Sequence, residues 1–382
     1  MGFQFINYAV TEEHQMLQDT LRRFLAEKLA PIAKELDDKE MIAMDVIKEM
    51  GRMGFLSLMA PEEYGGGGHD VVGAAIVAEE VSRICAGTYT STSGHVFCMH
   101  WIDKFGTKEQ RDKYIPKLAS GEYIGCIGIT EPEAGSDVAG LRTKAVKDGD
   151  HFVLNGTKTF ISNGNVADII VAMTRTGDPG PRGITNFIVE TKTAGYEASK
   201  PFEKLGNRAS PTCEVAFTDC RVPAENMLGS FNNGFIETMN FFPFERALVA
   251  VACGALAESS FHEALQYAHD RKQFGKPIIQ YQMVQAMLSD MACDIQAIKA
   301  MTKDCLQKYA SGIQANIEAS MAKLFASETV MKVTMNAIQI FGGYGYTREF
   351  PVERWFRDSK LYSIGGGTSQ IQRQIIARAM MK

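Results

Sequence analysis

Hydrophobic residues recur at helical spacing through the first third of the chain, from residue 11 to about residue 120. The run Thr11-Glu12-Glu13-His14 has the form of a helix start, because threonine can cap the first turn and acidic side chains favour that end. Four glycines at 65–68 interrupt the pattern and predict a loop. The positions at helical spacing are Phe24, Leu25, Leu29, Val46, Ile47, Met50, Ala74, Val77, Val81, Met99, Ile102 and Phe105. This segment is predicted to be all-helical.

Near Tyr123 the pattern changes to short β-branched and aromatic runs separated by Gly, Asn, Asp and Pro, which predict strands and turns. These runs are YIGCIGIT, HFVLNGTKTFIS, ADIIVAMTRT, NFIVET and CEVAFTDCRVP. Beyond Gly229 a long helical pattern rich in Ala and Met continues to the end. We therefore predict an α+β protein with an N-terminal all-α domain (1–122), a central antiparallel, β-barrel-like domain (123–230) and a C-terminal helical bundle (231–382).

Composition narrows the class of protein. The 382 residues are 45% hydrophobic and carry a formal net charge of -5, which argues against a nucleic-acid binder. Eight cysteines form no CxxC pair and no metal-ligand spacing, so we expect free thiols in a reducing cytoplasm and no metal centre. The N-terminus has no signal-peptide pattern, and the apolar run 247–257 is shorter than the roughly 20 residues that span a bilayer. A cytoplasmic protein without a membrane span is expected.

Three motifs carry candidate chemistry. GITEPEAGSDVAG (128–140) leaves a strand and enters a loop whose N–H groups and hydroxyls could face a ligand, although a tight surface loop has the same composition. QIFGGYGYTREFPVERWFRD (339–358) holds a Gly-Gly pair that lets a helix approach a neighbour or a pyrophosphate. RKQFG (271–275) is a basic and aromatic helix end. Each motif alone is weak.

Together and in this order, these segments resemble the acyl-CoA dehydrogenase family of flavoproteins. The blocks FGTKEQRDKYIPKLASGE, NGTKTFISNG and KLGNRASPTCEVAFTDCRVPAENMLG are similar to the family as well, so the resemblance covers nearly the whole chain. It implies a C-terminal four-helix bundle, FAD between that bundle and the β-domain, and a homotetramer in which FAD also touches a neighbouring subunit. The implied reaction is α,β-dehydrogenation of an acyl-CoA, with electrons passed to electron-transfer flavoprotein.

The resemblance also assigns site residues, although structural capping stays open for any single polar one. Phe160 would pack on the flavin, where many relatives have Trp, and Ser136 would lie near the acyl-CoA phosphates. Arg271, Phe274 and Gln282 would meet FAD of the adjacent subunit. The residues implied to bind FAD are Ile129, Thr130, Phe160, Ser162, Arg271, Phe274, Gln282, Gln339, Gly343, Thr368 and Gln370.

The stretch LYSIGGGTSQIQR (361–373) departs from the pattern of medium- and short-chain members, which carry their catalytic Glu there. That place is Gly366, and the preceding Tyr place is Gly365. A glycine cannot abstract a proton, but the resemblance implies that the Gly366 N–H, with a flavin ribityl hydroxyl, binds the thioester oxygen. The two missing side chains leave room beside the substrate α-carbon, which favours a branched, cyclic or aryl-substituted acyl group.

Glu245 is the candidate base. The segment FFPFERALVAVACGALAE resembles isovaleryl- and long-chain-type members, which place the base on a helix of the C-terminal domain. Glu245 shares a helical face with Leu248, Val249, Ala252 and Leu256, and a carboxylate on an apolar face is costly without a purpose or a partner. The structural alternative is a glutamate paired with arginine. By resemblance, Arg246 orients CoA or the helix end.

Alternatives stay open at this stage. Some relatives recruit an Asp from the N-terminal domain, but no carboxylate lies between Arg83 and Asp103. Thr88 stands where glutaryl-type members place an Arg, and His95 and His100 are expected to be structural. The aromatics Tyr89, Phe241, Phe242 and Phe244 could wall a pocket or simply fill the core. Rival functions are a ring-diene-forming dehydrogenase, an enoyl-CoA reductase, an oxidase, or a non-catalytic flavoprotein scaffold.

Overall fold

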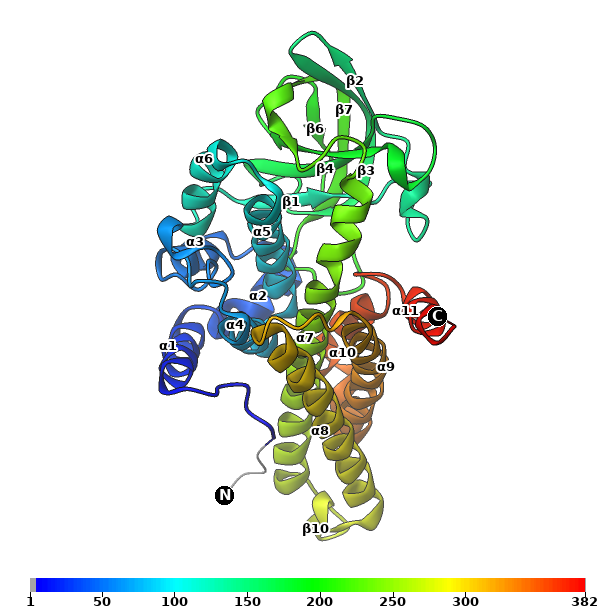
Figure 1. Ribbon diagram of the computed structural model, residues 1–382. Coiled ribbons are helices and arrows are strands. Elements are labelled where there is room, and N and C mark those ends of the chain that lie inside the picture. Colours follow the sequence, from blue (N-terminus) through cyan, green and yellow to red (C-terminus); the bar gives the residue numbers. More distant parts are fainter. Residues whose placement is uncertain (1–4, 382) are drawn as a thin grey trace.

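The structure, a computed structural model, describes residues 5–381 and is built from a helical N-terminal part, a central sheet and a C-terminal set of long helices (Figure 1). The first helix starts as predicted, since the Thr11 hydroxyl accepts a hydrogen bond from the His14 N–H at 3.2 Å. The N-terminal helices are α1 (Glu12–Lys28), α2 (Ala33–Lys39), α3 (Met44–Arg52), α4 (Val71–Ile84), α5 (Ala86–Phe105) and α6 (Lys108–Ala119).

The central sheet has the strand order β6-β7-β3-β2-β4-β5-β8. Its strands are β1 (Gly125–Gly128), β2 (Lys144–Asp148), β3 (His151–Ser162), β4 (Ile169–Arg175), β5 (Ile184–Glu190), β6 (Tyr196–Ala198), β7 (Thr212–Pro223) and β8 (Met227–Leu228). Most pairs are antiparallel as predicted, but β1 runs parallel to β4, and β2 meets β4 in parallel at one residue pair. The chain enters β1 from helix α6 and not through a hairpin turn. The direction of β1 therefore depends on how the helical part packs and not on the spacing of the strands along the sequence.

The C-terminal part consists of α7 (Gly234–Asp270), α8 (Gln282–Ala310), α9 (Asn316–Phe341), α10 (Val352–Ser359) and α11 (Ser369–Met380). Helices α7, α8 and α9 pack on one another, and α10 and α11 pack against α9. The short hairpin β9 (Lys272–Gln273) and β10 (Lys276–Pro277) lies at the end of the bundle that is farthest from the sheet (Figure 1).

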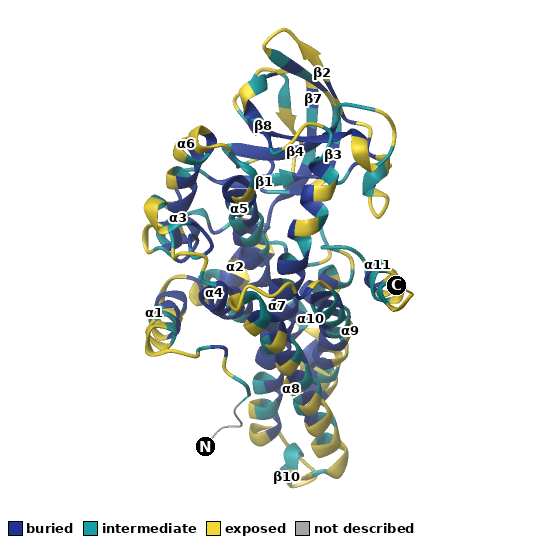
Figure 2. Ribbon diagram, in the orientation of Figure 1, coloured by how far each residue is buried: buried dark blue, intermediate teal, exposed yellow. Residues whose placement is uncertain are grey.

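Helix α7 is the centre of the core (Figure 2). By length and composition it could cross a membrane, with a mean hydropathy of 1.2 over its most apolar window. However, 72% of that window is buried inside the protein, which is the environment of a core helix in a soluble protein.

Candidate active site

Glu245 lies on α7, two residues after Pro243, which has no N–H for the helix ladder. Its side chain is only partly accessible, and burial raises the pKa of its carboxyl to about 7. The charges of Arg246 and Lys323 act in the opposite direction, since nearby cations favour the ionised carboxylate. A carboxyl group with this pKa can accept and release a proton near neutral pH.

The glycine loop between α10 and α11 faces this carboxylate. A Cβ placed on Gly366 would lie 3.9 Å from Glu245 Oε1 and 4.0 Å from Lys323 Cε. Gly366 and Gly367 have φ angles of 63° and 89°, which glycine adopts without strain. The Glu245 carboxylate therefore reaches the same space toward which a side chain at position 366 would point.

Three side chains hold the carbonyls of this loop. The buried Lys323 Nζ donates to Gly367 O at 2.7 Å, and Gln372 Nε2 donates to Gly366 O and Gly367 O at 3.1 and 3.0 Å. Arg246 Nε donates to Gly366 O at 3.4 Å. Among residues 5–381, no acceptor is assigned to the Gly366 N–H, so this donor is available to a ligand.

The predicted aromatic wall is assembled only in part. Phe241 packs on Phe97 and Trp101, and Phe244 packs on Tyr309, so both fill the core. Tyr89, by contrast, borders a small apolar cavity of about 30 Å³ together with Leu248, which is one helical turn from Glu245. The hydroxyl of Tyr89 is buried without a hydrogen-bond partner, and burial followed by the charge of Glu245 raises its pKa.

At the sheet, the candidate cofactor residues lie around a turn at Ile129 and Thr130, whose backbone carbonyls accept hydrogen bonds. The carbonyl of Ile129 accepts from Lys158 Nζ at 3.2 Å, and the carbonyl of Thr130 accepts from the Thr159 N–H at 2.8 Å. Phe160 is 66% exposed, with its ring on the outside of the sheet, and Ser162 ends β3. The ring of Phe202 lies 5.5 Å from the Phe160 ring, and most of the Phe160 side chain stays open to solvent.

A second group of candidate residues lies at the far end of the bundle. Arg271 and Gly343 line a hollow of about 540 Å³, where the Arg271 guanidinium stands 5.8 Å from the centre of the Tyr344 ring. A Cβ on Gly343 would meet nothing within 4 Å, and Phe274 is 96% exposed. Gln282, the first residue of α8, is exposed at this same end. Gln339, in the last turn of α9, is exposed there as well. Arg271 follows α7 directly, and Glu245 lies 26 residues earlier on this helix, about 39 Å away, so the two do not meet within one chain.

The remaining candidates divide between structural and open positions. Thr368 caps α11, because its hydroxyl accepts from the Ile371 N–H at 3.2 Å. Gln370 and Ser136 are exposed, and Gly365 borders the loop without crowding. His95 is structural as predicted: its buried Nδ1 accepts from the Gly125 N–H at 3.1 Å.

Two lysines that shape the site, Lys323 and Lys158, were not predicted from the sequence. Lys323 lies on the buried face of α9, among Ala319, Ala322 and Ala326, and a lone lysine on an alanine-rich face was the available signal. Lys158 forms a buried pair with Glu131 at 2.8 Å, and this pair holds the turn at Ile129. Its partner stands 27 residues away, which no periodicity reveals.

Comparison with known families covers almost the entire chain. The model for "Acyl-CoA dehydrogenase, N-terminal domain" matches residues 11–122, the one for the middle domain matches 126–220, and the one for the C-terminal domain matches 232–381.

Curated relatives are similar over their full length. The chain is 40% identical to the short-chain specific acyl-CoA dehydrogenase of Clostridium acetobutylicum (97% of this chain, 99% of that one). It is 38% identical to the mitochondrial isovaleryl-CoA dehydrogenase of Pongo abelii (97% and 89%) and 36% identical to the 3-(aryl)acrylate reductase of Clostridium sporogenes (97% and 99%).

Solved structures have the same fold. Butyryl-CoA dehydrogenase from Megasphaera elsdenii superposes with a TM-score of 0.96 at 36% identity, covering 99% of this chain and 100% of that one. A chain from a structural study of the electron transferring flavoprotein of Acidaminococcus fermentans also gives 0.96, at 38% identity with coverage of 99% and 100%.

Proposed function

The chain belongs to the acyl-CoA dehydrogenase family, and on that premise we propose that it oxidises an acyl-CoA thioester between Cα and Cβ with Glu245 as the base. The observation that carries this proposal is the meeting of Glu245 with the Gly366 loop, since a Cβ there would lie 3.9 Å from Glu245 Oε1. Glu245 takes the α-proton, and the β-hydrogen leaves as hydride.

The local chemistry supports these roles. The α-proton of a thioester is weakly acidic, so removing it requires a donor at the carbonyl oxygen and a base of suitable pKa. The free N–H of Gly366 is such a donor, and the pKa of Glu245 near 7 suits proton abstraction at neutral pH. No side chain accepts a hydride, so FAD supplies that chemistry when it is bound.

The residues present fit FAD. The open ring of Phe160 beside Thr130 offers an apolar platform with polar neighbours, and the hydroxyl of Ser369 is buried without a partner at the start of α11. The hollow at Arg271 and Gly343 combines a cation with unhindered backbone, which suits a pyrophosphate. Because it lies far from Glu245, we assign it to the cofactor of an adjacent subunit in a homotetramer.

We assign the acyl group to the branched, cyclic or aryl-substituted class. The support is the space at Gly365 and Gly366, together with relatives named for isovaleryl-CoA and arylacrylate. A relative named as short-chain specific makes straight chains the control. A panel of butyryl-, octanoyl-, isovaleryl-, cyclohexanecarbonyl- and 3-phenylpropionyl-CoA tests this; a preference for butyryl- or octanoyl-CoA contradicts it.

A second candidate is the reverse reaction, reduction of an α,β-unsaturated thioester. Two reductases among the relatives favour it, one of them named acryloyl-CoA reductase (NADH). Electron-transfer flavoprotein in a cytoplasmic setting is the proposed redox partner in either direction. Turnover with oxygen alone, without that partner, would instead indicate an oxidase.

The decisive experiment replaces the base. Glu245→Gln keeps the size of the side chain and removes its basicity, so we expect bleaching of the flavin by substrate to slow by roughly 10²- to 10⁴-fold. Glu263→Gln, on the same helix, is the matched control and should bleach at the wild-type rate. If Glu245→Gln binds FAD and bleaches as fast as wild type, another group is the base.

A further inference from the structure

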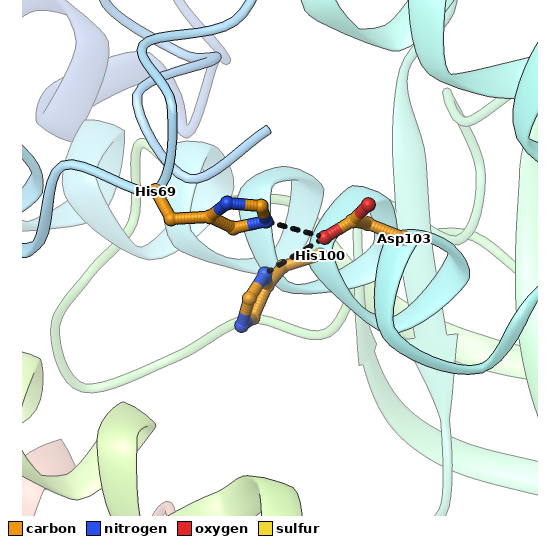
Figure 3. Close-up of side chains that lie close together, drawn as sticks. All are labelled: His69, His100 and Asp103. Carbon is orange, nitrogen blue, oxygen red and sulfur yellow. Dashed lines mark hydrogen bonds and ion pairs between the residues drawn. The ribbon is translucent and has the colours of Figure 1, made fainter. Parts of the chain in front are cut away.

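A cluster of two imidazoles and one carboxylate lies outside the candidate active site (Figure 3). His69 lies in the loop 65–70, directly before α4, and His100 and Asp103 lie on successive turns of α5. His69 Nε2 lies 2.8 Å from Asp103 Oδ2, and His100 Nδ1 lies 3.9 Å from the same oxygen. One ligand atom from each residue falls within 4.8 Å of the others.

The second histidine is not explained by a simple His–Asp pair. His100 Nδ1 is buried and has no hydrogen-bond partner, and 3.9 Å is too long for it to donate to Asp103. A buried, unpartnered imidazole nitrogen near a carboxylate that already contacts another imidazole is the arrangement that a shared cation satisfies.

We propose that His69, His100 and Asp103 bind a zinc ion. Two imidazole nitrogens and a carboxylate oxygen are the ligand types that zinc prefers, and a water would complete four-coordination. Magnesium and calcium prefer all-oxygen sites and do not fit this ligand set. The side chain of His69 is 47% exposed, so an ion can enter from solvent, whereas Asp103 is buried.

The loop is held in place for this role by its backbone. The Gly67 N–H donates to Ser57 O at 3.0 Å, the Gly68 N–H donates to Ala60 O at 3.0 Å, and the Asp70 N–H donates to Leu58 O at 2.8 Å. His69 between them has a φ of 64°, a left-handed conformation that is uncommon outside glycine. The ring is thus presented to α5 by fixed neighbours, so a small rotation of its side chain completes the site.

Zinc would also affect the helix that carries the base. The ring of His100 packs on Phe241 at 5.1 Å and on Phe244 at 6.0 Å, and both precede Glu245 on α7. An ion that fixes His100 therefore stabilises the loop, α5 and this segment of α7 together. The proposal does not depend on the identity of the base or of the substrate.

The test uses FAD-loaded protein stripped with a chelator and titrated with Zn²⁺ in a calorimeter. We expect one ion per chain, no binding of Mg²⁺, and a rise in melting temperature with zinc. Co²⁺ should give visible absorption bands of a four-coordinate site with nitrogen ligands.

His69→Asn keeps the left-handed backbone and should weaken zinc binding at least tenfold, as should Asp103→Asn. His151→Asn is the matched control, because His151 forms a His–Asp pair with Asp150 that no third ligand among residues 5–381 joins. Absence of stoichiometric zinc binding by wild type, or equal affinities of wild type and His69→Asn, overturns the proposal.

Discussion

At the scale of single residues, the candidate site depends on the balance of charge around Glu245. Burial raises the pKa of its carboxyl, while Arg246 and Lys323 restrain that rise. The pKa of Lys323 is itself lowered to about 8 by burial, and Glu245 counteracts this. Lys323 also donates to Gly367 O, so one ammonium group both tunes the base and holds the loop.

Lys323→Met should therefore shift the pH profile of flavin reduction. A base works only when it is deprotonated, so activity rises as pH passes through the pKa of Glu245. Removing the cation raises that pKa, and we expect the midpoint to move upward by roughly one pH unit. Reduction near pH 7 should slow about fivefold, since the deprotonated fraction falls from about one half to about one eleventh. It should recover at higher pH, and stopped-flow bleaching across pH measures both.

Lys332→Met is the control, because this lysine lies on the same helix and pairs with Asp294 at the surface. An unchanged midpoint in Lys323→Met would show that the lysine holds the loop without tuning the pKa of Glu245.

Among single residues, Glu245 could be predicted from the sequence, whereas the contacts of Lys323 could not. Glu245 could be found because a carboxylate breaks an apolar helical face, and that signal lies within a few turns of one helix. The partners of Lys323 could not, since Gly367 lies 44 positions away and meets it only through the packing of α11 on α9.

At the scale of elements, the loop at residues 365–367 connects α10 to α11 and has two roles. Its carbonyls are held by side chains of α7, α9 and α11, and among residues 5–381 no acceptor is assigned to the N–H of Gly366. The space above Gly366 is open enough for a side chain, because nothing lies closer than 3.9 Å to a Cβ there.

A carboxylate moved between the two elements should restore the base. Gly366→Glu in a Glu245→Gln background returns a carboxylate to the same space, at a cost of roughly 1–2 kcal/mol for the positive φ. We expect partial recovery of flavin bleaching with butyryl-CoA and little with α-branched substrates, since the new side chain occupies their space.

Gly366→Gln in the same background is the matched control and should stay inactive. Recovery in both double variants, or in neither when both bind FAD, would contradict this exchange.

The elements and most strand directions were predictable, but the parallel pairing of β1 was not. Strand runs and turns in the sequence identify the central domain, because a period of two and turn residues are local signals. The parallel pairing of β1 with β4 depends on where α6 delivers the chain, which is a matter of tertiary packing. The cluster at His69 was missed for the same reason, as His69 and Asp103 are 34 positions apart in the sequence.

At the scale of the whole molecule, one group of candidate cofactor residues lies at the sheet and the other lies at the end of the bundle farthest from it (Figure 1). If subunits complete each other's sites, an exposed residue far from Glu245 controls retention of the cofactor. Phe274→Ala should therefore lower the ratio of flavin to protein severalfold after gel filtration, because its ring buries apolar area only against a partner.

Met16→Ala, which changes an exposed side chain on α1, is the control and should keep its flavin. Full flavin content in Phe274→Ala would mean that the far end of the bundle does not touch the cofactor.

Helix α7 carries Glu245 near one end and leads into Arg271 at the other, 26 residues and about 39 Å further on. The number of helical residues between Glu245 and Arg271 therefore fixes the distance between them. One inserted residue between them would turn everything beyond it by about 100° and lengthen the helix by about 1.5 Å. We expect almost no insertions or deletions in this stretch among the active members of a mutational library, whereas the turn at Gly275 should accept them.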